Sequence, residues 1–242
     1  MNTQSLLNIN PATLPQAYDF LIQGNYLLAA NLYEQAIDNE PDMKSHYWYL
    51  GLTLLLQGQE VEAQTTWFMA MMEGEPEKVD NCNQELVELL QTEAERREAL
   101  KEYAIAEKIR QQIKEIQPKN IHNILHLVQL AVKLETYTGE EVSELGLIEI
   151  LQSEPDLAVD VPLLLQVLQS VLRDTFLHHS LLEFIKVCLQ YLKNNLNDFF
   201  NILLPAAIEI AYSQKQSAIA ARLGEMYLQL DPDNAEFLLH LS

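Results

Sequence analysis

The sequence is poor in cysteine, glycine and basic residues, and each shortage excludes a class of protein. Its two cysteines, Cys82 and Cys188, lie far apart and outside any CxxC motif, so no disulfide framework is indicated. Only seven of the 242 residues are glycine, which disfavours a fold built from strands and tight turns. Both cysteines are therefore expected to be small buried hydrophobic residues in a reducing compartment.

Basic residues are few compared with acidic residues. Lysine and arginine number 15 against 35 acidic residues, so the formal net charge is −20. A surface this acidic repels nucleic-acid phosphates and anionic lipid headgroups, so neither nucleic acid nor a membrane is expected as a partner. A protein or peptide of basic or neutral character is expected instead. The alternative is that the acidity only keeps an extended protein soluble.

Signals of export, membrane insertion and common enzyme chemistry are also lacking. The first residues have no basic region followed by an apolar core, and no uncharged apolar stretch reaches the roughly 20 residues that span a bilayer. A soluble, cytoplasmic protein is expected. No GxGxxG, GxxxxGK[ST] or GxSxG motif occurs. We therefore expect no catalytic residue and no cofactor in this chain.

Histidine spacing gives a weak metal-site hypothesis. His122 and His126 are four residues apart and can share one side of a helix, but no HExxH pattern and no third ligand accompany them. His178 and His179 are adjacent, so they point in different directions on a helix and are expected at the surface. No metal is expected.

A 34-residue repeat is the strongest feature that is present. Four residues of one unit recur 34 positions later: Gly24, Ala29, Tyr33 and Ala36 become Gly58, Ala63, Trp67 and Ala70. A corner glycine followed by small residues on a second helix is typical of stacked helical hairpins. The glycine can close a helix in the left-handed conformation, and the small residues let two backbones approach.

Helical spacing and corner residues predict three hairpins in residues 11–119. The predicted helix pairs are 14–23 with 26–38, 42–57 with 59–73, and 81–95 with 98–116. The basic run from Arg96 to Lys119 falls in the third hairpin. Glu93 lies four residues before Arg97, so one i, i+4 pair is available on the helix. Given the net charge of −20, a solvated helix or a clamp to an acidic neighbouring helix is favoured over RNA binding.

The rest of the chain follows the same plan less regularly. Residues 1–10 are a polar leader. Residues 120–200 keep the helical period but lose the 34-residue consensus, which predicts degenerate hairpins of the same array; Asp160 and Pro162 mark one helix start. Residues 201–242 return to the consensus and then begin a further first helix that stops at Ser242. This ending predicts the front part of a longer protein, or a homo-oligomer formed through an uncapped last helix. The alternative is that the last helix is a natural cap that packs wholly on its predecessor.

The repeat residues resemble those of tetratricopeptide repeats. Small residues at helix contacts, and a proline near the last turn, match in three places: Ala29, Ala36 and Pro41; Gly51, Ala63 and Ala70; Ala220 and Pro232. The resemblance covers roughly half of the chain. It implies an all-α fold, a right-handed superhelical solenoid of antiparallel helix pairs, which binds another polypeptide in a groove.

A narrower resemblance is carried by residues 26–36, 49–60 and 231–242. They are similar to the N-terminal repeats of bacterial SPINDLY-type proteins, which are O-linked N-acetylglucosamine transferase-like. In that family the repeats precede a glycosyltransferase domain and help to select protein acceptors. Such transferases often carry inner-face asparagines, and the matching positions here hold Pro15, Tyr49, Ala206 and His240. The resemblance implies an alternative function, the acceptor-selecting arm of a transferase whose catalytic domain is absent from this chain.

By analogy with tetratricopeptide repeats, five apolar side chains of the first helices are expected to face the groove and contact a partner. They are Leu14, Tyr18, Trp48, Leu52 and Leu55. Such a groove suits a helix or an extended segment. The alternative is that these residues pack against their own array. The function predicted from the sequence is a scaffold that binds a partner polypeptide without bond chemistry.

Overall fold

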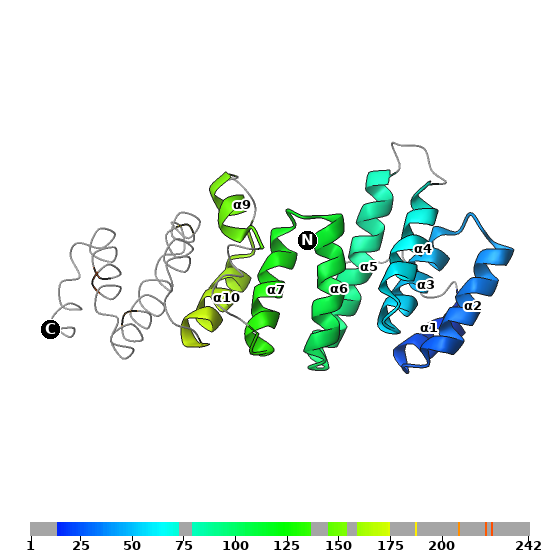
Figure 1. The fold of residues 1–242 in the computed structure, drawn as a ribbon, viewed down its shortest axis with the longest axis horizontal. Coiled ribbons are helices and arrows are strands. Elements are labelled where there is room, and N and C mark those ends of the chain that lie inside the picture. The colour runs from blue at the N-terminus through cyan, green and yellow to red at the C-terminus, as the bar shows by residue number, and fades with distance from the viewer. Residues whose placement is uncertain are drawn as a thin grey trace, which may run out of the picture. The chain divides into compact units, whose positions relative to one another are not determined.

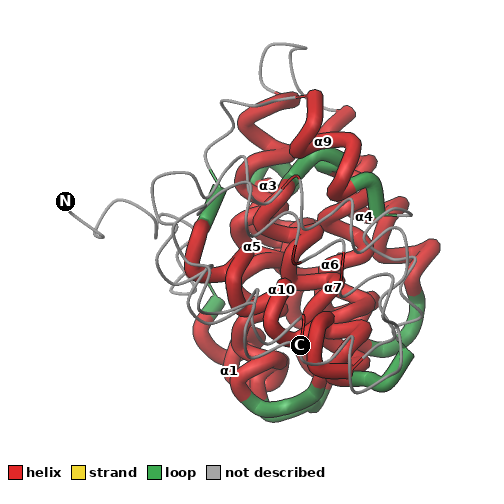
Figure 2. Tube along the Cα trace, turned by 90° about the vertical axis from the view of Figure 1, so that its left-hand side faces the viewer, coloured by secondary structure: helices red, strands yellow, loops and turns green. Residues whose placement is uncertain are grey.

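The computed structural model describes residues 14–72, 79–136, 145–153 and 159–174, together with the single helical residues Val187, Ile208, Ala221 and Gly224. Every element in these ranges is an α-helix and none is a strand, which confirms the all-α prediction (Figure 1, Figure 2). No helix in the described ranges is both long enough and apolar enough to cross a bilayer. The chain divides into two compact units, Met1–Ile116 and Gln117–Ser242, and each is described by itself.

The first unit contains three pairs of helices, and a short corner joins the members of each pair. The pairs are α1 (Pro15–Ile22) with α2 (Tyr26–Asn39), α3 (Lys44–Leu56) with α4 (Glu60–Met72), and α5 (Val79–Ala99) with α6 (Tyr103–Ile116). In addition, α3 packs against α2 and against α5 (Figure 1). Three neighbouring helices therefore surround α3.

A residue in the left-handed conformation closes the first helix of each pair. The three residues are Gly24 (φ 80°), Gly58 (φ 82°) and Lys101 (φ 61°). After each of them, a backbone N–H donates to a carbonyl oxygen five residues earlier: Asn25 to Phe20 at 2.8 Å, Gln59 to Leu54 at 3.0 Å, and Glu102 to Arg97 at 2.9 Å. These bonds satisfy carbonyl groups that the helix end leaves without partners.

The predicted position of the third corner, between residues 95 and 98, is wrong. The helix α5 continues to Ala99, and the corner lies at Lys101. The i, i+4 ion pair between Arg97 Nε and Glu93 Oε1, at 2.6 Å, supports this continuation. The left-handed residue of this corner is a lysine, at a cost of about 1 kcal/mol. The sequence therefore has no glycine to mark the corner.

The helix α3 is buried on all sides over most of its length. Every residue from His46 to Thr53 is buried. This run carries no carboxylate, lysine or arginine, and a helix that is apolar all round belongs in a core. The Tyr49 ring stacks on Tyr33 of α2 with ring centroids 5.5 Å apart, and it meets the edge of Tyr18 of α1 at 5.9 Å. Aromatic contacts thus join the first three helices.

Gly51 marks a close approach of α3 to α4. The indole Nε1 of Trp67 donates to the backbone oxygen of Trp48 at 3.2 Å, and a Cβ atom on Gly51 would collide with that nitrogen. Only glycine leaves room for the indole. The repeat alanines of the two hairpins are buried as well: Ala29, Ala36, Ala63 and Ala70. Pro41, by contrast, lies exposed after the end of α2.

In the second unit, α7 (Ile121–Lys133) packs against α9 (Leu147–Ser153) and α10 (Val161–Asp174). Side-chain caps begin two of these helices. The side-chain oxygen Oδ1 of Asn120 accepts from the backbone N–H of Asn123, and Oδ1 of Asp160 accepts from the backbone N–H of Leu163, both at 3.0 Å. The helix start predicted at Asp160 and Pro162 is therefore confirmed.

The corner after α7 repeats the geometry of the first unit. Glu135 is left-handed (φ 58°), and the Thr136 N–H donates to the Ala131 oxygen, five residues back, at 2.9 Å. Lys101 and Glu135 are 34 residues apart, as are Gly24 and Gly58. The repeat spacing thus persists in the backbone where no glycine shows it. The consensus residues Ala220 and Pro232, and the further helix expected before Ser242, lie outside the described residues.

The left-handed lysine gives a stability prediction. We expect Lys101→Gly to stabilise the protein by about 1 kcal/mol, because glycine adopts this conformation without a Cβ penalty. Gly58→Ala should destabilise it by a similar amount, since the conformation is strained even though nothing lies within 4 Å of the added Cβ. Urea unfolding monitored by circular dichroism measures both. Equal stability of Lys101→Gly and Lys101→Ala would contradict the assignment.

The contact at Gly51 gives a second prediction. Gly51→Ala should cost about 2–3 kcal/mol, because the methyl group displaces the Trp67 indole from a packed interior. In a Trp67→Phe background the same substitution should cost less, since the ring no longer carries the nitrogen atom that the methyl group would meet. Thermal melts of the two single variants and the double variant measure this coupling. Strict additivity of the two changes would show that the contact does not exist.

Candidate functional site

Three of the five residues predicted to contact a partner lie in the core. Trp48, Leu52 and Leu55 of α3 are at most 5% exposed. Leu14 and Tyr18, next to and within α1, are half-buried and pack against the same core. The structure thus packs these side chains in or against the core of the first unit. Contact between any of the five and a partner remains a prediction.

The helix α5 explains the burial of α3. Trp48 Nε1 donates to Glu85 of α5 at 3.4 Å, and Lys44 Nζ lies 2.9 Å from the sulfur of Cys82, also on α5. Both contacts join the same two helices. They place α5 against the side of α3 on which the sequence predicted an open groove.

Exposed apolar side chains gather instead on α4. Val61, Phe68, Met69 and Met72 are 71%, 60%, 56% and 69% exposed, respectively. Val61, Phe68 and Met72 are spaced by seven and four residues and so lie on one side of the helix. We call these three, with Thr65 and Met69, the outer face of α4. Single exposed apolar residues are common on proteins, but four on one short helix indicate a contact surface.

The 34-residue repeat does not predict this face, although the sequence of α4 indicates it. The other side of α4 is buried through the repeat residues Ala63, Trp67 and Ala70. The same helix also carries Phe68, Met69, Met71 and Met72. One buried side of a helix does not accommodate so many large apolar side chains, so some of them must face away from the core.

A cavity of about 220 Å³ adjoins the outer face, between α4, α5 and α6. Its lining is mostly apolar and comprises Gln64, Trp67, Phe68 and Met71 of α4, Asn83 and Leu86 of α5, and Gln112, Glu115 and Ile116 of α6. Trp67 and Leu86 are buried, whereas Phe68 belongs to both the cavity and the outer face. The cavity is below the usual size of a small-molecule site of about 300–1,000 Å³, so it suits a single side chain.

A chain of hydrogen bonds forms the polar wall of this cavity. Gln64 Nε2 donates to Gln112 Oε1 at 2.9 Å and to Glu115 Oε2 at 2.8 Å. Gln112 Nε2 in turn donates to Glu60 Oε1 at 2.7 Å. These bonds tie α4 to α6 and fix the width of the cavity. Because the amide groups are bonded to one another, the apolar lining is the part left to recruit a ligand.

Two arginines of the basic run, Arg97 and Arg110, are paired within the protein. Arg97 is 5% exposed, and its guanidinium donates to Glu93 at 2.6 Å, to Glu102 at 2.7 Å and to the hydroxyl of Tyr26 on α2 at 3.2 Å. Arg110 is fully buried and donates to Glu98 at 2.5 Å. Burial lowers the pKa of Arg110 and the nearby Glu98 opposes that shift. Arg110 of α6 thus pairs with an acidic residue of the neighbouring helix α5, as the clamp interpretation of the run has it, whereas Arg97 pairs with Glu93 on its own helix.

Metal-ligating residues do not converge in the described part of the chain. His122 and His126 share one side of α7, as their spacing predicted, with ring centroids 4.8 Å apart. Within the described ranges, no group of three or more His, Cys, Asp or Glu side chains could hold a metal ion.

Comparison with models of known protein families gives no match, and comparison with curated proteins gives none either. The resemblances to tetratricopeptide repeats and to SPINDLY-type transferases therefore stay predictions.

The cluster of Tyr18, Tyr33 and Tyr49 gives a pH prediction. Burial, with smaller effects from Tyr18 and Glu93, raises the pKa of Tyr49 to about 12, and burial also raises the pKa of Tyr33. In the unfolded chain a tyrosine ionises near pH 10. The unfolded state then holds fewer protons than the native state, so stability is fully present below pH 10 and falls as the pH rises toward 12.

Tyr33→Phe and Tyr49→Phe should each flatten this alkaline loss of stability, because phenylalanine has no proton to lose. Each substitution should remove up to about 1.4 kcal/mol of destabilisation per pH unit above pH 10. Urea unfolding at pH 8 to 11.5 measures the slope. If the slope is the same in both variants as in the parent protein, the two hydroxyl groups are not buried in the native state.

Proposed function

We propose that this chain is a protein-binding module that holds a partner polypeptide on the outer face of α4. One observation carries the proposal: four exposed apolar side chains on a single helix adjoin a cavity whose polar wall is already hydrogen-bonded. An apolar centre of this kind is what the buried core of a protein interface requires. The helix pairs of the whole chain belong, in this proposal, to one right-handed superhelical array like those of tetratricopeptide repeats.

The chemistry of the cavity favours binding over catalysis. Its lining contributes one ionisable side chain, Glu115, and that carboxylate already accepts a hydrogen bond from Gln64. General acid–base or nucleophilic catalysis needs a second group within reach. An anchor pocket for one apolar side chain of a partner needs neither.

Of the groove predicted along the first helices, the proposal keeps only the part formed by Leu14 and Tyr18 as a second surface. Leu14 and Tyr18 are the two predicted contact residues that stay half-buried, so they are the positions of that set which a partner can still reach. The alternative function, the acceptor-selecting arm of a glycosyltransferase, uses the same kind of binding step. No contact among the described residues favours that alternative over a stand-alone scaffold.

A photoreactive amino acid at position 68 tests the proposal. We expect benzoylphenylalanine in place of Phe68, in the full chain, to cross-link one recurring polypeptide segment in an extract of the native host, because the side chain lies at the centre of the proposed contact. Mass spectrometry of the cross-linked peptides identifies the segment. The control is the same amino acid at Leu27, which is 69% exposed on α2.

Two outcomes decide this experiment. With the same amino acid also placed at position 72, a segment captured at positions 68 and 72, but not at position 27, supports the proposal. Equal capture of unrelated segments at all three positions would contradict it, because a specific interface selects one partner surface.

A further inference from the structure

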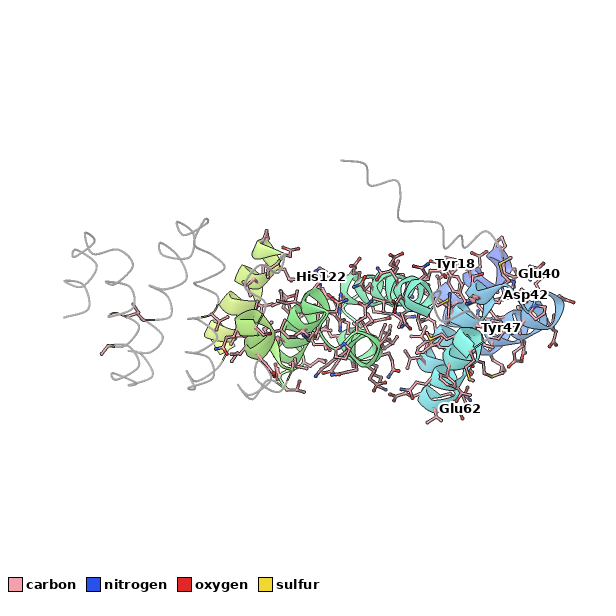
Figure 3. All side chains as sticks on the ribbon, turned by 90° about the horizontal axis from the view of Figure 1, so that it is seen from above. Tyr18, Glu40, Asp42, Tyr47, Glu62 and His122 are labelled. Carbon is pink, nitrogen blue, oxygen red and sulfur yellow. The ribbon has the colours of Figure 1, made fainter. Side chains whose placement is uncertain are left out.

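Carboxylates flank the apolar surface that the proposed function uses. Glu60 and Glu62 lie exposed in the first turn of α4. Glu62 is seven residues before Met69, so both lie on the same side of the helix. Figure 3 shows Glu62 at the edge of the first unit opposite Tyr18. On the other side of the outer face, exposed Glu115 of α6 lines the cavity.

Positive charge is scarce around this surface. The helix α4 contains no lysine or arginine, and residues 14–72 contain a single lysine, Lys44, against seven acidic residues. That lysine is directed at the sulfur of Cys82, 2.9 Å away. On α6, Lys108 lies one turn before Gln112, whereas Lys114 is two residues after Gln112 and so lies on the other side of the helix. Three carboxylates, those of Glu60, Glu62 and Glu115, therefore face one lysine. The apolar outer face thus has an acidic rim.

We propose that the occupant of this surface is a basic amphipathic helix of a partner protein. This inference rests on the proposed function and adds the chemistry of the partner. One bulky apolar side chain of that helix enters the cavity beside Phe68, and lysine or arginine side chains on its flanks face Glu60, Glu62 and Glu115. Such complementarity steers association and fixes orientation at an interface.

The dimensions of the surface fit a helix. Val61 and Met72 are 11 residues apart, which is about 16 Å along the axis of α4 at 1.5 Å per residue. An amphipathic helix covers such a length with apolar residues spaced by three and four positions. A second copy of this chain is a poor occupant, because it carries the same charge of −20 and would bring two acidic rims together.

Three fluorescent peptides, each about 18 residues long, test the inference against the full chain. The first peptide places leucine and phenylalanine on one helix face and lysine on the other. The second peptide replaces lysine with glutamate. The third has the composition of the first in an order that has no apolar face. We expect the first peptide to bind at least about tenfold more tightly than the third, and the second not to bind. Fluorescence anisotropy measures all three.

Matched substitutions locate the binding surface. Phe68→Asp should weaken binding of the first peptide by about tenfold or more, although the new charge alone would attract it. Leu27→Asp adds the same charge at an exposed apolar position on α2 and should change the affinity less than about twofold. Glu62→Gln should weaken binding severalfold at low salt, while Glu34→Gln, on α2, should not. Circular dichroism establishes that the four variants are folded.

Every outcome counts for or against the inference. Equal binding of the first and third peptides, or equal effects of Phe68→Asp and Leu27→Asp, would overturn it, because the attraction would then be unspecific. If none of the peptides binds but position 68 still captures one polypeptide segment, the proposed function is supported and the inference of a basic amphipathic helix is overturned. A captured segment that comes from this chain itself makes a second copy the occupant and also overturns the inference. If neither experiment detects binding, both proposals fall.

Discussion

The close contact between α3 and α4 at Gly51 is the constraint on which the rest of the first unit depends. Because Gly51 has no side chain, the Trp67 indole reaches the backbone of α3 and donates to the Trp48 oxygen. This contact turns one side of α4 into the core and leaves the opposite side facing outward. The same tryptophan lines the cavity, so a single side chain links the packing of the core to the surface proposed to bind a partner.

Polar contacts from the third helix pair complete this surface. The bonds of Gln64 and Gln112 hold α4 against α6, while Arg97 joins α5 to Tyr26 of α2. Each of these side chains is half-buried or buried and engages a defined partner. Charge is therefore divided between two roles. The arginines of the third helix pair form ion pairs within the protein, whereas the carboxylates of Glu60, Glu62 and Glu115 are exposed at its surface.

Sequence patterns predicted the helices where the chain uses the expected residue for each role. Gly24 and Gly58 mark their corners because glycine is the usual left-handed residue. Lys101 and Glu135 adopt the same conformation without a signature in the sequence, and the third corner was therefore misplaced. The expected contact residues Trp48, Leu52 and Leu55 are buried because the long helix α5 covers α3, which a repeat consensus does not predict. The composition of α4 indicates its outer face. The cavity, by contrast, is formed by three helices together and cannot be predicted from the sequence of one helix.

Native-state hydrogen exchange of the full chain tests most directly whether α3 is the enclosed centre of the first unit. A helix buried on all sides exchanges its amide protons only when the whole unit unfolds. The account predicts that the amides of Tyr49 to Leu52 are the slowest of residues 14–116, with a free energy of opening equal to that of global unfolding. If these amides exchange through local opening, as fast as those of α1, then α3 does not organise the packing and the orientation of α4 loses its basis.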